Sequence, residues 1–345
     1  MNKLLSGIKD IIDSNKLNYW NGKFGKMFEE TFAEYVGVKY CVAVNSGSMA
    51  LEIAIKSLNL KPQSKIIVPS KSYIATASSV LRCGHIPVFA DVDINGNISM
   101  ASVNEIIDKE VKAIIIVHLG GVPVDVKDFK YSGVKIIEDC SQAHGSRING
   151  KVVGSFGDIA VWSFCHNKVI TTMGEGGMIG TNYKKYFDFC WSLKEVGKNI
   201  NKLGKKLIHE NIGTNARMTE VQAFFGLHQL NNLSNLIETR NKIVKTYKSL
   251  LDNTEINFPI VGSEKIVSYQ KLNLISCYRD KYLKLPFVSL GNTAELYKEP
   301  IFKKQKPLFM AKYLSESGFT ISLSSNTLRK EIEENCRKII KCKKS

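Results

Sequence analysis

Short apolar, β-branched runs alternate with segments of helical periodicity through the first half of the chain. In the helical segments apolar residues recur at intervals of three and four, as in Leu51–Leu58 and Ala75–Leu81. Nearly continuous apolar strands that alternate with helices predict an α/β domain with a mostly parallel sheet. The predicted strands are Lys39–Val44, Lys65–Val68, Pro87–Ala90, Ala113–His118, Lys135–Glu138, Ile159–Phe164 and Gly177–Gly180.

The second half of the chain is organised differently. A polar, lysine-rich loop follows Asn201, and a continuous helical pattern predicts one long helix from Thr219 to Leu251. The remaining sequence is less regular and ends in a charged helix, Leu328–Ile340. We therefore predict a large α/β domain over residues 1–240 and a small C-terminal α+β domain over residues 241–345.

Composition narrows the class of protein. The chain has 345 residues, of which 44% are apolar and 23% are charged, which is typical of a globular protein and excludes disorder as the dominant state. Its longest apolar runs fall far short of the roughly 20 residues that a membrane span needs. The N-terminal segment contains acidic residues and lacks the apolar stretch of a secretory signal. We expect a cytoplasmic protein with no membrane partner.

The charge distribution argues against a nucleic-acid-binding protein, and the cysteine spacing argues against a metal site. The chain has 48 basic and 32 acidic residues, a formal charge of +16. The basic residues are scattered, with no aromatic-interleaved stripe and no zinc-finger or helix-turn-helix motif, so we expect no nucleic-acid partner. A positive protein does suit an anionic small substrate. None of the eight cysteines forms a CxxC pair, which predicts reduced thiols and no metal site.

Ligands bind beyond the carboxyl ends of strands in sheets of this kind, so the residues after each strand are the first candidates for a site. One strand ends at Asn45, and Ser46, Gly47 and Ser48 then open a helix. Small residues there present backbone N–H groups and hydroxyls at a positive helix terminus, which favours a phosphate. A simple N-cap with a glycine turn explains the same residues.

A carboxylate follows another strand. The segment KIIEDCSQAHG places Asp139 at the strand end, with Gln142 and His144 close behind. A carboxylate held there can keep the ring nitrogen of a cofactor protonated. Alternatively, Asp139 caps the turn that follows.

A lysine follows a third strand. The strand ends at Ser163, and Lys168 lies in the loop after it. A lysine that is desolvated beside a strand edge has the lowered pKa that Schiff-base chemistry needs, although most lysines are solvated. The glycines that follow do not match GxGxxG and precede a strand rather than a helix, which argues against a dinucleotide site.

Together these segments supply the three groups that hold pyridoxal 5′-phosphate: a phosphate cradle, a partner for the ring nitrogen and an amine for the aldehyde. Tyr73, just after a strand, could stack on the pyridine ring or belong to the core.

The order of these segments resembles the DegT/DnrJ/EryC1/StrS family, which comprises sugar aminotransferases of the fold-type I pyridoxal phosphate enzymes. The resemblance spans roughly residues 20–240. The matching stretches are NSGSMAL, VPSKSYIATASSVL, PVFADVD, VHLGGVPVD, IEDCSQAHGSRINGKVVGSFGDIAVWSF, Lys168 with TTMGEGGMI, and NARMTEVQAFFGLHQL.

The resemblance implies roles for individual residues in the centre of the site. Lys168 matches the lysine that bonds to the cofactor aldehyde, and Asp139 matches the carboxylate paired with the ring nitrogen. Gln142 matches a side chain near the ring hydroxyl, and Tyr73 matches the stacking aromatic.

It also implies a phosphate site that is completed by a second subunit. Gly47, Ser48 and Ser163 match the phosphate-binding groups of one subunit. Asn215 matches an asparagine that the family contributes to the phosphate across a homodimer interface. The family usually has Thr where Ser48 stands, and both residues carry the hydroxyl.

The function that the resemblance implies is transfer of an amino group, with glutamate as donor, to a nucleotide-linked keto-deoxyhexose in surface-polysaccharide or other glycan biosynthesis. Two alternatives remain open. Some relatives have His at the lysine position and act as sugar dehydratases, and Lys168 argues against that reaction here. A non-catalytic regulatory protein of the same fold would not need Lys168, Asp139, Gln142 and Ser163 together.

Overall fold

The computed structural model describes residues 2–202, 208–291, 294–302 and 305–344. Its centre is a seven-stranded sheet in which five neighbouring strands run parallel and β9 runs antiparallel to both of its neighbours. In spatial order the strands are β1 (Tyr40–Val44), β9 (Gly177–Thr181), β8 (Ile159–Ser163), β5 (Lys135–Asp139), β4 (Val111–Val117), β2 (Lys65–Pro69) and β3 (Ile86–Ala90). The predicted mostly parallel α/β sheet is confirmed, with strand limits within two residues of those expected.

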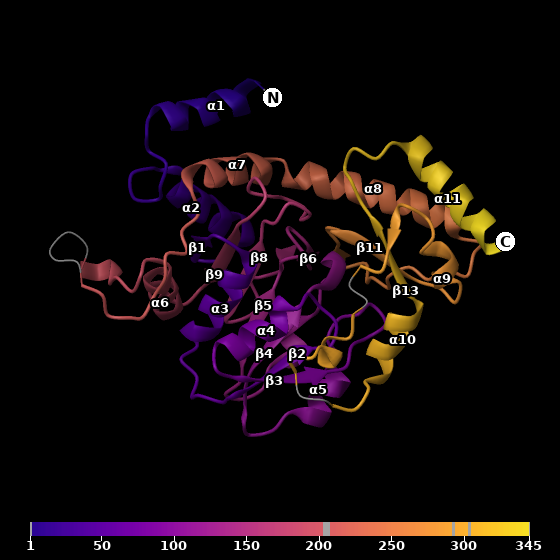
Figure 1. Ribbon diagram of the computed structural model, residues 1–345, viewed down its shortest axis with the longest axis horizontal. Helices are drawn as coiled ribbons and strands as arrows, with labels where there is room; N and C mark the ends of the chain where they lie inside the picture. The colour runs from indigo at the N-terminus through magenta and orange to yellow at the C-terminus, as the bar shows by residue number, and fades with distance from the viewer. Residues whose placement is uncertain (1, 203–207, 292–293, 303–304, 345) are drawn as a thin grey trace.

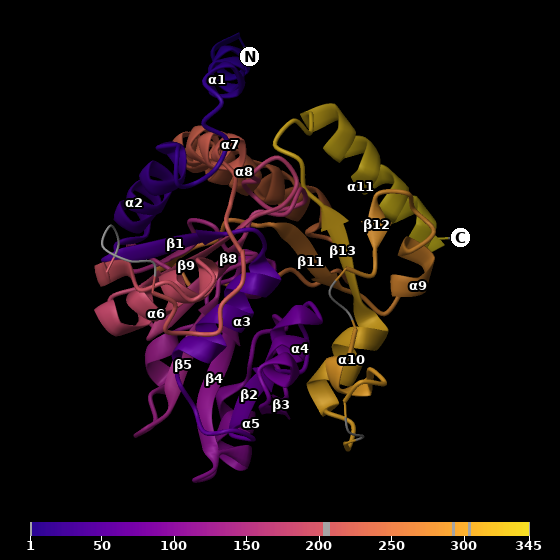
Figure 2. The same cartoon turned by 60° about the vertical axis from the view of Figure 1, so that its left-hand side comes forward.

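Helices cover both faces of this sheet (Figures 1 and 2). Side chains of α3, α4 and α6 join one apolar cluster with the sheet, whereas those of α2, α5 and α7 join clusters on the other face. The bounds are α2 (Phe24–Val36), α3 (Gly47–Ser57), α4 (Ala75–Arg82), α5 (Met100–Ile106), α6 (Lys184–Lys194) and α7 (Glu220–Asn231), with α1 (Asn2–Asp13) lying against α7.

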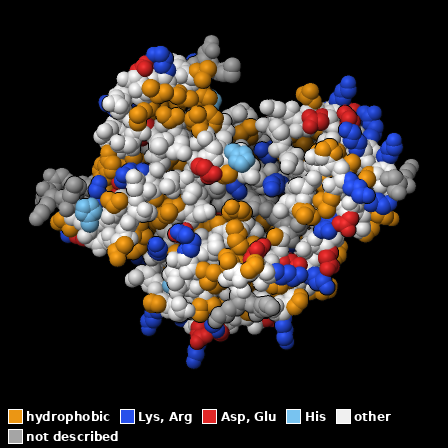
Figure 3. Space-filling model, viewed as in Figure 1, with side chains coloured by type: hydrophobic (Ala, Val, Ile, Leu, Met, Phe, Trp, Pro, Cys, Tyr) orange, Lys and Arg blue, Asp and Glu red, His pale blue; other side chains and the backbone are white. Residues whose placement is uncertain are grey.

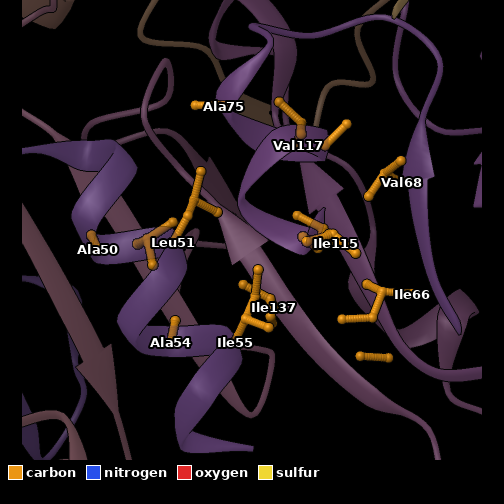
Figure 4. Packing of buried hydrophobic residues seen from close by; sticks show 14 of the residues in the cluster. Ala50, Leu51, Ala54, Ile55, Ile66, Val68, Ala75, Ile115, Val117 and Ile137 are labelled. Atoms are coloured by element: carbon orange, nitrogen blue, oxygen red, sulfur yellow. The ribbon is translucent and has the colours of Figure 1, made fainter. Parts of the chain in front are cut away.

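The strands are apolar on both faces because alternate side chains enter different clusters. Ile115 and Val117 of β4 pack in the cluster that contains α3, and Ile114 and Ile116 pack on the opposite side. In Figure 4 the apolar face of α3 lies against these strands, and Ile137 of β5 points toward it. Truncating such a side chain to Ala costs about 2–5 kcal/mol, so this contact fixes α3 firmly on the sheet.

The predicted long helix is wrong in one respect, because it is two helices. α7 ends at Asn231, and α8 (Leu233–Leu251) begins after Asn232, whose φ of −102° and ψ of 0° are not helical. Asn has a poor helix propensity, and the two consecutive Asn residues mark the break that the apolar pattern alone does not show. The break ends the helix that covers the large sheet and starts one that reaches the C-terminal sheet (Figure 1).

The C-terminal part contains an antiparallel three-stranded sheet in the order β11–β13–β12. Its apolar cluster includes side chains of α8 and of the last helix. The predicted boundary at residue 240 falls within α8, and the division at that residue remains a prediction. The bounds are β11 (Lys271–Ile275), α9 (Arg279–Tyr282), β12 (Val288–Ser289), α10 (Phe309–Ser317), β13 (Gly318–Ser322) and α11 (Arg329–Lys344).

A third, small sheet joins the two parts of the chain. Its strands are β10 (Lys265–Ile266), β6 (Arg147–Ile148) and β7 (Lys151–Val152), in that order. The lysine-rich loop predicted after Asn201 lies partly outside the described residues, at positions 203–207. Lys and Arg side chains are spread over the face in Figure 3, with several over α11. No helix in the described ranges combines the length and apolar content that crossing a bilayer requires.

Candidate active site

A cavity of about 430 Å³ lies at the carboxyl ends of the central strands. It brings together seven of the eight residues that the sequence predicts as site residues, from segments that are far apart in the chain. Those seven are Gly47, Ser48, Tyr73, Asp139, Gln142, Ser163 and Lys168.

The N-terminus of α3 and the end of β8 form one wall of this cavity. A Cβ atom on Gly47 would lie 2.6 Å from Cβ of Ser163, so only glycine allows this approach. On the next strand, a Cβ on Gly177 would lie 2.4 Å from the carbonyl oxygen of Ser46. The Ser46 hydroxyl accepts a hydrogen bond from the Met49 N–H at 3.2 Å and caps the helix. This leaves a small-residue concavity at a positive helix terminus, which fits a phosphate.

The Asp139 carboxylate is held at the end of β5 by two hydrogen bonds. Its Oδ2 accepts from the Thr76 hydroxyl at 3.1 Å, and its Oδ1 accepts from the Ser141 N–H at 3.1 Å. Ser72 and Thr76 share a further hydroxyl hydrogen bond of 2.8 Å. Asp139 and Thr76 are both buried, so the orientation of the carboxylate is fixed before any ligand binds.

Lys168 lies in the loop after β8, where its N–H donates to the Cys165 carbonyl at 3.0 Å. Within the described ranges its amine has no hydrogen-bond or salt-bridge partner. Burial lowers the pKa of this amine, and the negative charge of Asp139 opposes that effect without cancelling it. The amine is therefore less protonated near neutral pH than an ordinary lysine, as a nucleophile requires.

Gln142 and Tyr73 occupy opposite environments in the cavity. Gln142 is buried, and its Oε1 accepts from the Gly120 N–H at 2.8 Å. Tyr73 is 64% exposed, which leaves its ring open at the mouth of the cavity.

Two histidines lie nearby. His144 is buried against the Phe164 ring, with ring centroids 5.6 Å apart, and burial lowers its pKa to about 3. The His118 ring accepts from the Val124 N–H at 3.0 Å and contacts Glu138 at 3.2 Å. Glu138 also accepts from three backbone N–H groups, so the cluster of His118, Glu138 and Cys140 serves to hold loops in place.

Asn215 is the predicted site residue that the structure does not bring to the cavity of its own chain. It is exposed and pairs with Glu195 in an isolated β-bridge. Glu195 is fully buried and accepts from Trp20 Nε1 at 2.9 Å and from Arg217 at 2.8 Å. The segment that carries Asn215 is therefore anchored, and its side chain faces away from the interior.

Several residues of the site were missed by sequence reasoning. Thr76 is a helix residue 63 positions before its partner Asp139, and no local pattern links them. Gln270 and Lys271 enter from the C-terminal part of the chain, where the sequence contains no recognisable motif. The hydroxyl-rich segment around Thr76 was a usable signal, whereas Lys271 had none.

These residues fit pyridoxal phosphate. The concavity at Gly47 and Ser163 is open to an anion, and the Asp139 carboxylate is oriented for a protonated ring nitrogen. Lys168 offers an amine that has no partner among the described residues. All three line one cavity, as a cofactor that is held by phosphate, ring and aldehyde requires.

The model of the DegT/DnrJ/EryC1/StrS aminotransferase family matches residues 2–327. The chain belongs to this family. Pyridoxal phosphate is the cofactor of the family. A GDP-perosamine synthase of Vibrio cholerae is 31% identical to this family member over 323 residues, which cover 92% of this chain and 87% of the relative.

Solved structures agree with this assignment to the DegT/DnrJ/EryC1/StrS family. An aminotransferase from Psychrobacter cryohalolentis has a TM-score of 0.92 and 30% identity, covering 98% of this chain and 96% of its own. A GDP-4-keto-6-deoxymannose-3-dehydratase has a TM-score of 0.88 at 23% identity, covering 98% of this chain and 97% of its own. The fold alone thus does not distinguish amino transfer from dehydration, and the residues of the site must do so.

Proposed function

We propose that this aminotransferase moves an amino group from glutamate to a nucleotide-linked keto-deoxyhexose. The observation that carries the proposal is the partly desolvated Lys168 amine, which has no partner in the described part of the chain and shares one cavity with the fixed Asp139 carboxylate. The name of the Vibrio cholerae relative, with its GDP-linked amino sugar, supports the nucleotide sugar as acceptor. The formal charge of +16 also favours a substrate with a diphosphate.

Each side chain has a separate task in this reaction. When bound, pyridoxal phosphate supplies an electron sink and a carbonyl carbon for the amines. Lys168 would hold the aldehyde carbon through its amine, and Nζ would be the base that takes the proton from the α-carbon of the donor. Asp139 would hold a proton on the ring nitrogen, and Thr76 and Ser141 keep the two oxygens of its carboxylate in place. Gly47, Ser48 and Ser163 would bind the phosphate, and Gln142 and Tyr73 would hold the ring.

We expect the protein to carry out this reaction as a homodimer, and to do so in the cytoplasm. Asn215 is exposed and anchored outside the cavity of its own chain, which supports a role at the phosphate of a partner subunit. Keto-sugar nucleotides are cytoplasmic precursors of glycans, so the product would enter surface-polysaccharide or other glycan biosynthesis.

Mass spectrometry of the sugar product tests the proposal. The loaded enzyme is incubated with glutamate and a panel of nucleotide-linked 4-keto-6-deoxyhexoses and 3-ketohexoses. Replacement of a carbonyl oxygen by an amine, together with formation of 2-oxoglutarate, is the expected result. Loss of a hydroxyl without gain of nitrogen would instead establish the dehydratase, and Lys168→His would then leave that reaction intact.

A further inference from the structure

One side of the cavity is closed by the C-terminal part of the chain. Gln270 and Lys271 line it together with Lys168 and Asn167, although Lys271 is the first residue of β11 and Gln270 precedes it. The positive charge of Lys271 also acts on Lys168, whose pKa it lowers in addition to the larger effect of burial. A second lysine therefore lies within electrostatic range of the reacting amine.

Hydrogen bonds to three other segments fix the position of the residues next to Lys271. Arg240 of α8 is buried and donates to the carbonyls of Tyr269 at 2.9 Å and Gln270 at 3.4 Å. The Gln270 side chain donates to the carbonyl of Asn167, the residue before Lys168, at 2.9 Å. The Gln270 N–H donates to the Gly120 carbonyl at 3.1 Å. Lys271 is thus positioned against the Lys168 loop by fixed contacts.

The Lys271 amine has no counter-ion in the described part of the chain. It is half-buried, and burial lowers its pKa. Lys194 shows the ordinary arrangement for a buried lysine, since its amine lies 3.1 Å from a Glu29 carboxylate oxygen. Cations that are desolvated without such a partner are stabilised when an anionic ligand arrives.

We propose that Lys271 binds the carboxylate of the amino donor. This inference rests on the proposed function. The donor nitrogen must reach the position of the Lys168 amine, and its α-carboxylate is only two bonds from that nitrogen. The phosphate of the cofactor would bind elsewhere in the cavity, at Gly47 and Ser163. The diphosphate of a nucleotide sugar is several bonds farther from its reacting carbonyl than the α-carboxylate is from the donor nitrogen. A carboxylate is therefore the anion that a cation beside Lys168 recognises best.

A pair of nucleophiles that differ in one carboxylate tests the proposal. Aminooxyacetate and O-methylhydroxylamine both displace a lysine from bound pyridoxal phosphate, and only the first carries a carboxylate. The rate at which each abolishes the yellow absorbance of the loaded protein is measured for wild type, Lys271→Met and Lys271→Arg. Lys248→Met, an exposed lysine of α8, is the matched control.

We expect Lys271→Met to lower the rate of reaction with aminooxyacetate by roughly 10- to 100-fold, because a hydrogen bond to a charged group is lost. O-Methylhydroxylamine should react at the wild-type rate, and Lys271→Arg should restore most of the aminooxyacetate rate. The glutamate concentration for half-maximal bleaching should rise by a similar factor, with little change in the maximal rate. Equal slowing of both nucleophiles, or of neither, would overturn the proposal.

Two further readouts separate this proposal from its alternatives. In cofactor-free protein, acylation of Lys168 should occur at higher pH in Lys271→Met, because the neighbouring positive charge is gone while Asp139, Glu175 and Cys165 remain. An unchanged pH midpoint of Lys168 acylation contradicts the proposed carboxylate site. Weaker binding of GDP and UDP by Lys271→Met, with an unchanged rate of reaction with aminooxyacetate, contradicts it as well. If neither glutamate nor any other amino acid bleaches the wild-type protein, the proposed function itself is wrong. This result is obtained with the wild type alone and so is distinct from any effect of a Lys271 variant.

Discussion

Gly47 and Ser163 are so close that a Cβ atom on the glycine would lie 2.6 Å from Cβ of the serine. This contact brings the N-terminus of α3 to the end of β8 and forms the proposed phosphate site between them. The missing side chain at position 47 is therefore a requirement of the site as well as of the packing.

Gly47→Ala should weaken binding of pyridoxal phosphate by at least about tenfold. The added methyl group pushes α3 from β8, and loss of one hydrogen bond to a charged group costs about 1.5–3 kcal/mol. Ser48→Thr keeps the hydroxyl and is the matched control, expected to bind as wild type does. Fluorescence titration of the cofactor-free protein measures both, and equal affinities for Gly47→Ala and wild type would refute the phosphate site.

Asp139→Asn should lower the rate of glutamate-dependent bleaching by roughly 10²-fold or more while cofactor still binds. The amide has no negative charge with which to keep the ring nitrogen protonated. Thr76→Val removes only the hydroxyl that donates to Asp139 at 3.1 Å, and its effect should be smaller. Stopped-flow absorbance measures each rate, and a larger defect in Thr76→Val than in Asp139→Asn would contradict these roles.

Much of this site follows from the sequence because most of the predicted residues lie at the end of a strand or in the segment that follows it. Asp139 and Ser163 end parallel neighbours of one sheet, so the periodicity that predicts the strands also predicts that these residues converge. Thr76 and Lys271 could not be placed in this way. Thr76 points from a helix, and Lys271 reaches the cavity only through the packing of β11, which no local pattern specifies.

The stability of the protein should fall in mild acid because of His144. Its pKa is about 3 in the folded protein, against 6.5 ordinarily, so between these values only the unfolded chain binds the proton. Stability from this group is complete above pH 6.5 and falls by about 1.4 kcal/mol per pH unit below it. Urea unfolding at pH 7.5 and 5.5 should show a loss about 1.4 kcal/mol smaller in His144→Phe than in wild type. Equal losses would show that His144 accepts a proton in the folded state.

Lys194→Met should destabilise the fold by about 3–5 kcal/mol. Lys194 is fully buried, lies 3.1 Å from Glu29 and stands 3.5 Å from the centre of the Tyr19 ring. Its loss removes the positive charge beside the buried Glu29 carboxylate, which keeps only its hydrogen bonds from the Tyr19 hydroxyl and the Ala43 N–H among the described residues. Adding Glu29→Gln should recover a large part of that stability in urea unfolding, whereas additive losses in the double variant would argue against a coupled pair.

Mixing two inactive variants tests the contribution of Asn215 to a partner subunit. Lys168→Ala and Asn215→Ala homodimers should each be inactive. After subunit exchange, half of the dimers are mixed, and each mixed dimer has one intact site. Activity should therefore return to about one quarter of the wild-type value by mass action. No recovery, with exchange verified by native mass spectrometry, would place Asn215 in its own subunit's site, and an active Asn215→Ala homodimer would place it outside any site.

The central claim is that Lys168 and pyridoxal phosphate carry an amino group from a donor to a sugar. The most direct measurement is the absorbance spectrum of the loaded protein before and after glutamate, for wild type and Lys168→Ala. We predict a yellow band in the wild type that glutamate bleaches, and no such lysine-dependent band in the variant. A wild-type protein that forms no band with added pyridoxal phosphate, or a band identical in Lys168→Ala, would contradict the account.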